Sequence, residues 1–319
     1  MGRPLRGWRL VSAVALAALV TAALVGESRA LLAPRLWKAP VVPPSALLRW
    51  QAPALSSPTT ISVTDENARL MLDPDKDYVI RMPSGPVTVD GGVSIVGGRN
   101  VVMIGGEIFD DTPISEGMSP DHAYGLYLKD QTGTVHLEGL WIHGRGIGQA
   151  IVLAQGRGAT VQLQHSRLET LHPVGQVHTD GIQSWAGPYR LRLWDVTIRT
   201  AGVGLQTQPN QFVPVPVDTW EYRRVNIRQT TDDAYALWKA SGGGAWWREI
   251  HEAFWVKNLG HFAWPDSRSW NPGGGAKVEG QKLKVGVPPG GDFVPAGSVG
   301  AGYTPLGPGN SPRITPSTP

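Results

Sequence analysis

Six short stretches of this chain share one pattern, and that repeat constrains the fold more than any other feature. Each stretch carries an aliphatic residue at its fourth position. The stretches are GGEIFD, GLWIHG, HSRLET, DVTIRT, RVNIRQ and AFWVKN, with Ile108, Ile142, Leu168, Ile198, Ile227 and Val256 at that position. The steps between these residues are 34, 26, 30, 29 and 29. Such a period, built from short β-like runs and turns, is typical of a solenoid whose coils bury one another's aliphatic side chains.

A second set of short apolar runs precedes most of these stretches. The runs are GLYLKD from Gly125, AIVLAQ from Ala150, GIQSW from Gly181, GLQTQ from Gly204 and AYALWK from Ala234. Two or three strands per coil, with Gly, Asn and Asp at the corners, indicate parallel sheets. The sequence therefore predicts an all-β fold, a right-handed parallel β-helix of about six or more coils.

The two ends of the chain differ in composition from the repeats. Residues 1–30 combine three early arginines, an apolar run over 10–25 and small residues at a cleavage position, which predicts a signal peptide or a retained membrane anchor. Residues 31–58 are rich in Pro and Ala and read as a linker. The β-helix is expected over 59–271, and 272–319 is expected to be a Gly/Pro-rich disordered tail.

Charge and cysteine content exclude several classes of partner and site. The net charge of +3 lies within residues 1–30, where four Arg oppose one Glu, so the remainder is neutral and gives no sign of nucleic-acid binding. With no Cys, the chain has neither a disulfide framework nor a thiolate site. We expect a monomer that lies outside the cytoplasm, secreted or held at a membrane only by an uncleaved N-terminal segment.

The segment VHTDGIQSW, residues 177–185, is the first candidate site. His178 and Asp180 are two residues apart and would share a face of an extended strand, with Gln183 on the opposite face unless Gly181 forms a tight corner. The alternative is structural, because Asp, His and Thr at solenoid corners often hydrogen-bond to the backbone.

The segment TTDDAYALWKAS, residues 230–241, is the second candidate site. Asp232 and Asp233 introduce a run that carries Lys239. Paired carboxylates suit acid–base catalysis or hold a Ca²⁺ ion. The alternative is a turn whose charges are solvated.

The two segments together resemble the paired motifs of the polygalacturonase family, a branch of the pectin-lyase-like β-helix superfamily. The resemblance implies that Asp180, Asp232 and Asp233 serve an inverting hydrolysis and that His261 stands for a catalytic His. His178 replaces the family's Asn. The 52-residue interval from Asp180 to Asp232 places the two sites about 9–10 Å apart along the axis, at ~4.8 Å per coil.

The run ALWKAS is also similar to the base-carrying strand of uronate-polymer lyases in the same superfamily. That resemblance makes Lys239 the base that abstracts a proton, Ca²⁺ the cofactor held by the three Asp residues, and Arg223 or Arg224 the group that neutralises the substrate carboxylate. Hydrolysis and β-elimination both stay open.

The sequence thus predicts a β-helix that acts on or binds an extracellular polysaccharide along one sheet. The catalytic candidates are Asp180, Asp232, Asp233, Lys239 and His178, and the substrate-binding candidates are Gln183, Trp185, Gln206 and Trp238. The alternative is a non-catalytic β-helix for glycan binding, adhesion or envelope structure. An enzyme requires the candidates to converge on one groove, whereas a structural solenoid would scatter or bury them.

Overall fold

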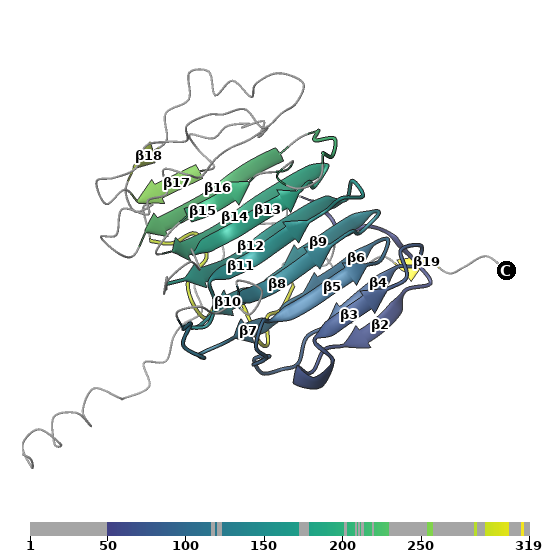
Figure 1. Cartoon of the computed structure of the whole chain (residues 1–319), viewed down its shortest axis with the longest axis horizontal. Coiled ribbons are helices and arrows are strands. Elements are labelled where there is room, and N and C mark those ends of the chain that lie inside the picture. Colours follow the sequence, from purple (N-terminus) through teal and green to yellow (C-terminus); the bar gives the residue numbers. More distant parts are fainter. Residues whose placement is uncertain are drawn as a thin grey trace, which may run out of the picture. The chain divides into compact units, whose positions relative to one another are not determined.

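The computed structural model describes residues 50–115, 119, 123–171, 179–200, 203–207, 209, 211, 214–218, 220–229, 254–257, 284–285, 291–305 and 314–315. Their strands form parallel sheets that stack as a β-solenoid of about five turns, with almost no helix (Figure 1). The predicted all-β parallel solenoid is confirmed, with about five turns where six or more coils were expected.

Two sheets make up the coils, and each turn of the chain visits both. Sheet I has six strands: β3 (Arg69–Leu72), β5 (Val93–Gly97), β8 (Tyr124–Lys129), β11 (Gln149–Ala154), β13 (Asp180–Ala186) and β15 (Val203–Thr207). Sheet II has eleven strands: β2 (Thr59–Ser62), β4 (Tyr78–Arg81), β6 (Val101–Ile104), β7 (Glu107–Phe109), β9 (Thr134–Glu138), β10 (Trp141–His143), β12 (Thr160–Thr170), β14 (Arg190–Thr200), β16 (Trp220–Gln229), β17 (Phe254–Lys257) and β18 (Lys284–Val285). A separate parallel pair joins β1 (Leu55–Ser56) to β19 (Ile314–Thr315), and one 3-10 turn, η2, covers Asp65–Asn67.

The aliphatic repeat forms a continuous ladder through sheet II. Six residues pair in register from coil to coil: Ile108, Ile142, Leu168, Ile198, Ile227 and Val256. The first five are at most 1% exposed. The period seen in the sequence is therefore the period of one coil.

Sheet I faces this ladder across the core. Leu126, Ile151, Ile182 and Leu205 pair in register and are fully buried. A Cβ on Gly181 would meet the Ile198 side chain, so the backbone of β13 approaches the ladder too closely for any larger residue. Gly181 and Ile182 both face inward, and this local irregularity places Asp180 on the outer face together with Gln183. The alternative that Gly181 interrupts the strict alternation therefore applies here, and Gln183 does not lie on the face opposite Asp180.

A bend recurs in sheet II at the first position of the five repeat stretches whose first residue the structure describes. Five residues there have positive φ angles: Gly105 (70°), Gly139 (71°), His165 (47°), Asp195 (55°) and Arg224 (50°). Left-handed backbone is easy for Gly, tolerated by Asp and His, and unfavourable for Arg. The bend forms a corner that runs along the solenoid. The residue at this corner is Gly in the first two repeats and a residue with a hydrogen-bonding side chain in the next three.

Residues 291–305, here called the C-terminal strap, lie along the outer side of sheet II. The backbone of Gly300 bonds to Gly139 and Gly106, and Val294 N donates to Thr197 Oγ1. The strap therefore crosses several coils within the range expected to be a disordered tail. Composition gave no sign of these contacts.

Residues 50–56, which lie within the range expected to be a linker, contact another part of the outer side of sheet II. The main chain of Trp50 forms two hydrogen bonds with the Gln164 amide, of 3.0 and 2.8 Å, and Gln51 O accepts from Gln162 Nε2 at 3.0 Å. The outward amides of β12 are thus satisfied by the chain itself.

Candidate functional site

The outer face of sheet I collects the candidate residues that the structure describes. In β13, Ile182 packs in the core and the next residue, Gln183, points outward, as does Trp185 two positions later. Gln183 pairs with Val152 on one side and Gln206 on the other. Asp180, Gln183, Trp185 and Gln206 therefore come together on one face, across β13 and β15.

Three aromatic rings lie on this face. Tyr124 and Tyr127 stack with ring centroids 5.8 Å apart and planes 18° apart. Trp185 reaches across β11, and its ring centroid lies 5.7 Å from Tyr124 and 6.2 Å from Tyr127. Tyr127 and Trp185 are partly exposed, whereas Val152 on the intervening strand is fully buried. The three rings make a platform that spans the coils of β8 and β13, which we call the aromatic platform.

Two buried amides stand beside the aromatic platform. Gln149 is 2% exposed and Gln183 is 3% exposed, and the Oε1 atom of each has no hydrogen-bond partner among the described residues. An unmet buried carbonyl costs about 1–3 kcal/mol, so natural proteins keep few of them. Among the described residues, these two oxygens are therefore unmet acceptors on the outer side of sheet I.

Asp180 occupies the start of β13 and is fully buried. With the Gln206 amide oriented so that its nitrogen donates, that nitrogen lies 3.1 and 3.2 Å from the two carboxylate oxygens of Asp180. The Gln206 amide therefore holds the Asp180 carboxyl group beside the amides of Gln149 and Gln183. Both carboxyl oxygens of Asp180 accept from the Gln206 amide, so they are acceptors like the Oε1 atoms of Gln149 and Gln183.

The hydroxyl of Tyr127 stays protonated on this face. Burial raises the pKa of the Tyr127 hydroxyl above its ordinary value of 10.0, and the nearby carboxylate of Asp130 adds to the effect. The aromatic platform therefore carries no charge from this tyrosine at neutral pH, and its hydroxyl is available as a donor.

The other candidates do not lie on the described part of this face. His178, Asp232, Asp233, Lys239, Trp238 and His261 fall outside the described residues. Arg224, one of the two arginines proposed to neutralise a substrate carboxylate, lies in sheet II, where its Nε donates to Asp195 Oδ1 at 3.0 Å. The catalytic predictions that depend on convergence with Asp180 stay predictions.

A second group of polar residues, not proposed from the sequence as a site, follows the corner of sheet II. His165 Nδ1 lies 2.9 Å from Asp195 Oδ2, and Asp195 Oδ1 accepts from both Nε and Nη2 of Arg224, at 3.0 and 2.9 Å. Phe293 of the strap covers the Arg224 guanidinium, 4.5 Å from the ring centroid. The three residues occupy the same position of successive repeats, three residues before Leu168, Ile198 and Ile227, so aligning the repeats would have revealed the row.

The strap is fastened to sheet II by Asp292. Its carboxylate accepts from Arg167 Nη1 at 3.0 Å, Arg228 Nη1 at 2.8 Å and Asn226 Nδ2 at 3.2 Å. Burial by itself would raise the pKa of Asp292, but the hydrogen bonds and charges of Arg228 and Arg167 outweigh burial and hold that pKa below its ordinary 3.8. The carboxylate is therefore ionised at neutral pH and holds the strap as a charged anchor.

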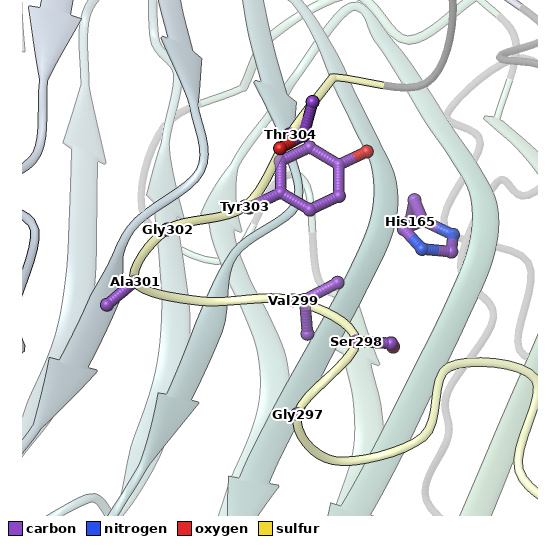
Figure 2. Close-up of a pocket in the computed structure, with 8 residues that line it drawn as sticks. All are labelled: His165, Gly297, Ser298, Val299, Ala301, Gly302, Tyr303 and Thr304. Carbon is purple, nitrogen blue, oxygen red and sulfur yellow. The ribbon is translucent and has the colours of Figure 1, made fainter. Parts of the chain in front are cut away.

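Farther along the strap, Tyr303 and its neighbours enclose a cavity against the corner. The cavity of ≈ 240 Å³ is lined by His165 from sheet II and by residues between Gly297 and Thr304 (Figure 2). The Tyr303 ring lies 5.8 Å from the His165 ring, and the Tyr303 hydroxyl donates to Glu138 Oε1 at 2.8 Å.

Neither a metal cluster nor a membrane span is found in the part of the chain that the structure describes. No group of three or more His, Cys, Asp or Glu side chains there could hold a metal ion. Within the same ranges, no helix is long and apolar enough to cross a membrane. The predicted signal segment lies outside them.

Comparisons with protein-family models, with curated proteins and with solved structures found no match to this chain.

Proposed function

We propose that this protein binds an extracellular polysaccharide along the outer face of sheet I. The observation that carries the proposal is the aromatic platform beside two buried amide oxygens that lack partners. Sugar rings present apolar C–H faces that pack on aromatic rings and hydroxyls that donate hydrogen bonds, so both features are met by the same ligand. Parallel coils repeat every ~4.8 Å, and such a face suits an extended polymer more than a compact molecule.

Cleavage of the bound polymer is a second candidate function, supported by Asp180. Its carboxylate lies on the same face as Gln183 and is held by Gln206. A single carboxylate does not make a glycosidase, because both hydrolytic mechanisms use a pair of carboxyl groups. The proposal of cleavage therefore depends on Asp232, Asp233 or Lys239 reaching this face.

A substitution that separates stability from binding tests the main proposal. In Gln183→Leu an unpaired buried carbonyl is replaced by an apolar group of similar size, so we expect the free energy of unfolding to stay the same or rise. The affinity for a polysaccharide should fall about tenfold, because a hydrogen bond from the sugar is lost and its hydroxyl is left unpaired.

Gln162→Leu is the matched control on the other sheet. Gln162 donates to Gln51 O and contacts His136 Nδ1 at 3.0 Å, so its loss should lower the free energy of unfolding by about 1–3 kcal/mol and leave sugar affinity unchanged.

The assay measures binding to a panel of neutral and uronate polysaccharides by affinity electrophoresis, and cleavage by new reducing ends and by absorbance of unsaturated products. Reducing ends alone would establish hydrolysis, and both signals together would establish elimination. If no polymer is retarded, or if Gln183→Leu binds a retarded polymer as tightly as the wild type does, the proposal fails.

A further inference from the structure

The cavity under the strap contains a histidine whose orientation is fixed by its neighbours. His165 is only 4% exposed, and its Nδ1 lies 2.9 Å from Asp195 Oδ2. A carboxylate oxygen accepts hydrogen bonds, so the tautomer that fits this contact carries its proton on Nδ1. The other nitrogen, Nε2, then has a free lone pair. It has no hydrogen-bond partner within the described ranges, and the ring lines the cavity (Figure 2).

Asp195 is itself held in place, so the imidazole has little freedom to turn. Nε and Nη2 of Arg224 both donate to Asp195 Oδ1, and the Phe293 ring of the strap packs over the guanidinium. All three polar residues of this row have left-handed backbone, which is unusual for Arg. Strained residues that hydrogen-bond in a row are found at sites where a side chain must be held in one orientation.

The remaining lining determines the kind of molecule that fits. Ser298 Oγ donates to Pro295 O at 2.7 Å, so toward the cavity it acts as an acceptor, as His165 Nε2 does. The ring of Tyr303 and the side chain of Val299 supply apolar surface, and the described lining residues include no Asp, Glu, Lys or Arg. A ligand for this cavity is therefore neutral, donates from hydroxyl groups and has an apolar face.

We propose that the cavity between the strap and the sheet II corner is a second binding site, in which His165 Nε2 accepts a hydrogen bond from a neutral sugar ring or polyol. The cavity of ≈ 240 Å³ has room for one small ring. The site is built from sheet II and the strap, so it is independent of the polysaccharide face proposed on sheet I. The occupant is either a free monosaccharide or the terminal residue of a glycan.

Nuclear magnetic resonance of the full-length chain, with ¹⁵N-labelled histidine, tests the proposal. The probes are glycerol, the methyl glycosides of glucose, galactose and mannose, and the matching trisaccharides. His165→Asn serves for assignment and as the test variant, because Asn tolerates left-handed backbone and its amide can still donate to Asp195. His143→Asn is the control, since His143 is a partly buried ring of sheet II that contacts Glu107 and does not line the cavity.

We expect at least one probe to move the His165 Nε2 resonance with a dissociation constant in the millimolar range, about what a few hydrogen bonds to a small ligand provide. His165→Asn should weaken that probe about tenfold, and His143→Asn should leave it unchanged. Tighter binding of a trisaccharide, with contacts to its end residue alone, identifies a glycan terminus, whereas equal binding identifies a free sugar or polyol.

Two results would overturn the proposal: a wild-type His165 Nε2 resonance that no probe moves, or a folded His165→Asn protein that binds as well as the wild type. If His165→Asn does not fold, Ser298→Ala replaces it, and a probe whose affinity this variant leaves unchanged counts against the site.

Discussion

The corner glycine Gly139 provides a direct test of how the strap is held. Its φ angle is +71°, and an added Cβ would meet three ring atoms of Tyr303. Gly139→Ala therefore has two costs: left-handed backbone for a non-glycine residue, about 1–2 kcal/mol, and displacement of the Tyr303 ring. Displacement gives up partly buried aromatic packing and the hydrogen bond to Glu138, about 2 kcal/mol more. Because an alanine also restricts the unfolded chain, the net backbone cost is about 1 kcal/mol, and the total loss in the free energy of unfolding is about 3 kcal/mol.

Gly158 is the matched control for this substitution. Its φ angle is +79°, but the nearest atom to an added Cβ is Tyr189 Cβ at 4.0 Å, so Gly158→Ala has only the backbone cost. Because an alanine also restricts the unfolded chain, the net loss should be about 1 kcal/mol or less. The difference between the two variants isolates the contact with Tyr303.

Urea denaturation of both variants, each made with and without Tyr303→Ala, completes the comparison. In the Tyr303→Ala background, Gly139→Ala should cost no more than Gly158→Ala, which gives a coupling energy of about 2 kcal/mol between positions 139 and 303. A coupling below about 0.5 kcal/mol would show that Tyr303 does not rest on the corner, and the strap would then not form the roof of the cavity.

Three further predictions concern the strap, the core and the binding face. Asp292→Asn should lower the free energy of unfolding by about 2 kcal/mol at neutral pH. The pKa of Asp292 is lowered in the folded protein, so its ionised carboxylate stabilises the fold at neutral pH, and this stabilisation is lost as the pH falls below 3.8 toward the folded-state pKa. The urea midpoints of variant and wild type should therefore converge below pH 3.8. Ile198→Ala removes a fully buried side chain between Leu168 and Ile227 and should cost about 3–4 kcal/mol in the same assay, with a smaller loss refuting the ladder as the main source of stability. Trp185→Ala should weaken polysaccharide retardation about fivefold or more while changing the melting temperature little, and unchanged retardation would count against the aromatic platform.

The coil repeat was predictable from sequence because a solenoid places chemically equivalent residues at equal intervals. Ile142, Ile198 and Ile227 face the same core, so each position favours the same kind of side chain. The candidate residues of β13 and β15 were predictable for the same reason, since Gln183 and Gln206 hold equivalent positions in successive coils. Strict alternation failed at Asp180 because the close approach of Gly181 to Ile198 reverses the face locally.

The strap and its cavity were not predictable, because their contacts join residues that lie 64 to 165 positions apart. Asp292 bonds to Arg167 across 125 positions, and Tyr303 bonds to Glu138 across 165. The strap sequence has no periodicity, and its Gly and Pro content resembles that of an unfolded tail. Only the corner row left a trace, as polar residues at positions 165, 195 and 224 where earlier repeats have Gly.

The two faces of the solenoid differ in how their glutamine amides are satisfied, and the difference bears on where a ligand binds. On sheet II, Gln162 and Gln164 bond to the main chain of Gln51 and Trp50, so the chain itself completes that face. On sheet I, the amide oxygens of Gln149 and Gln183 are as deeply buried and have no partner among the described residues. Stability alone does not explain why equally buried glutamine amides are hydrogen-bonded on sheet II and leave their oxygens unbonded on the described part of sheet I, because an apolar residue in either sheet I position would be more favourable. A polymer bound as we propose would supply donors to these oxygens, so sheet I is the face on which we expect it.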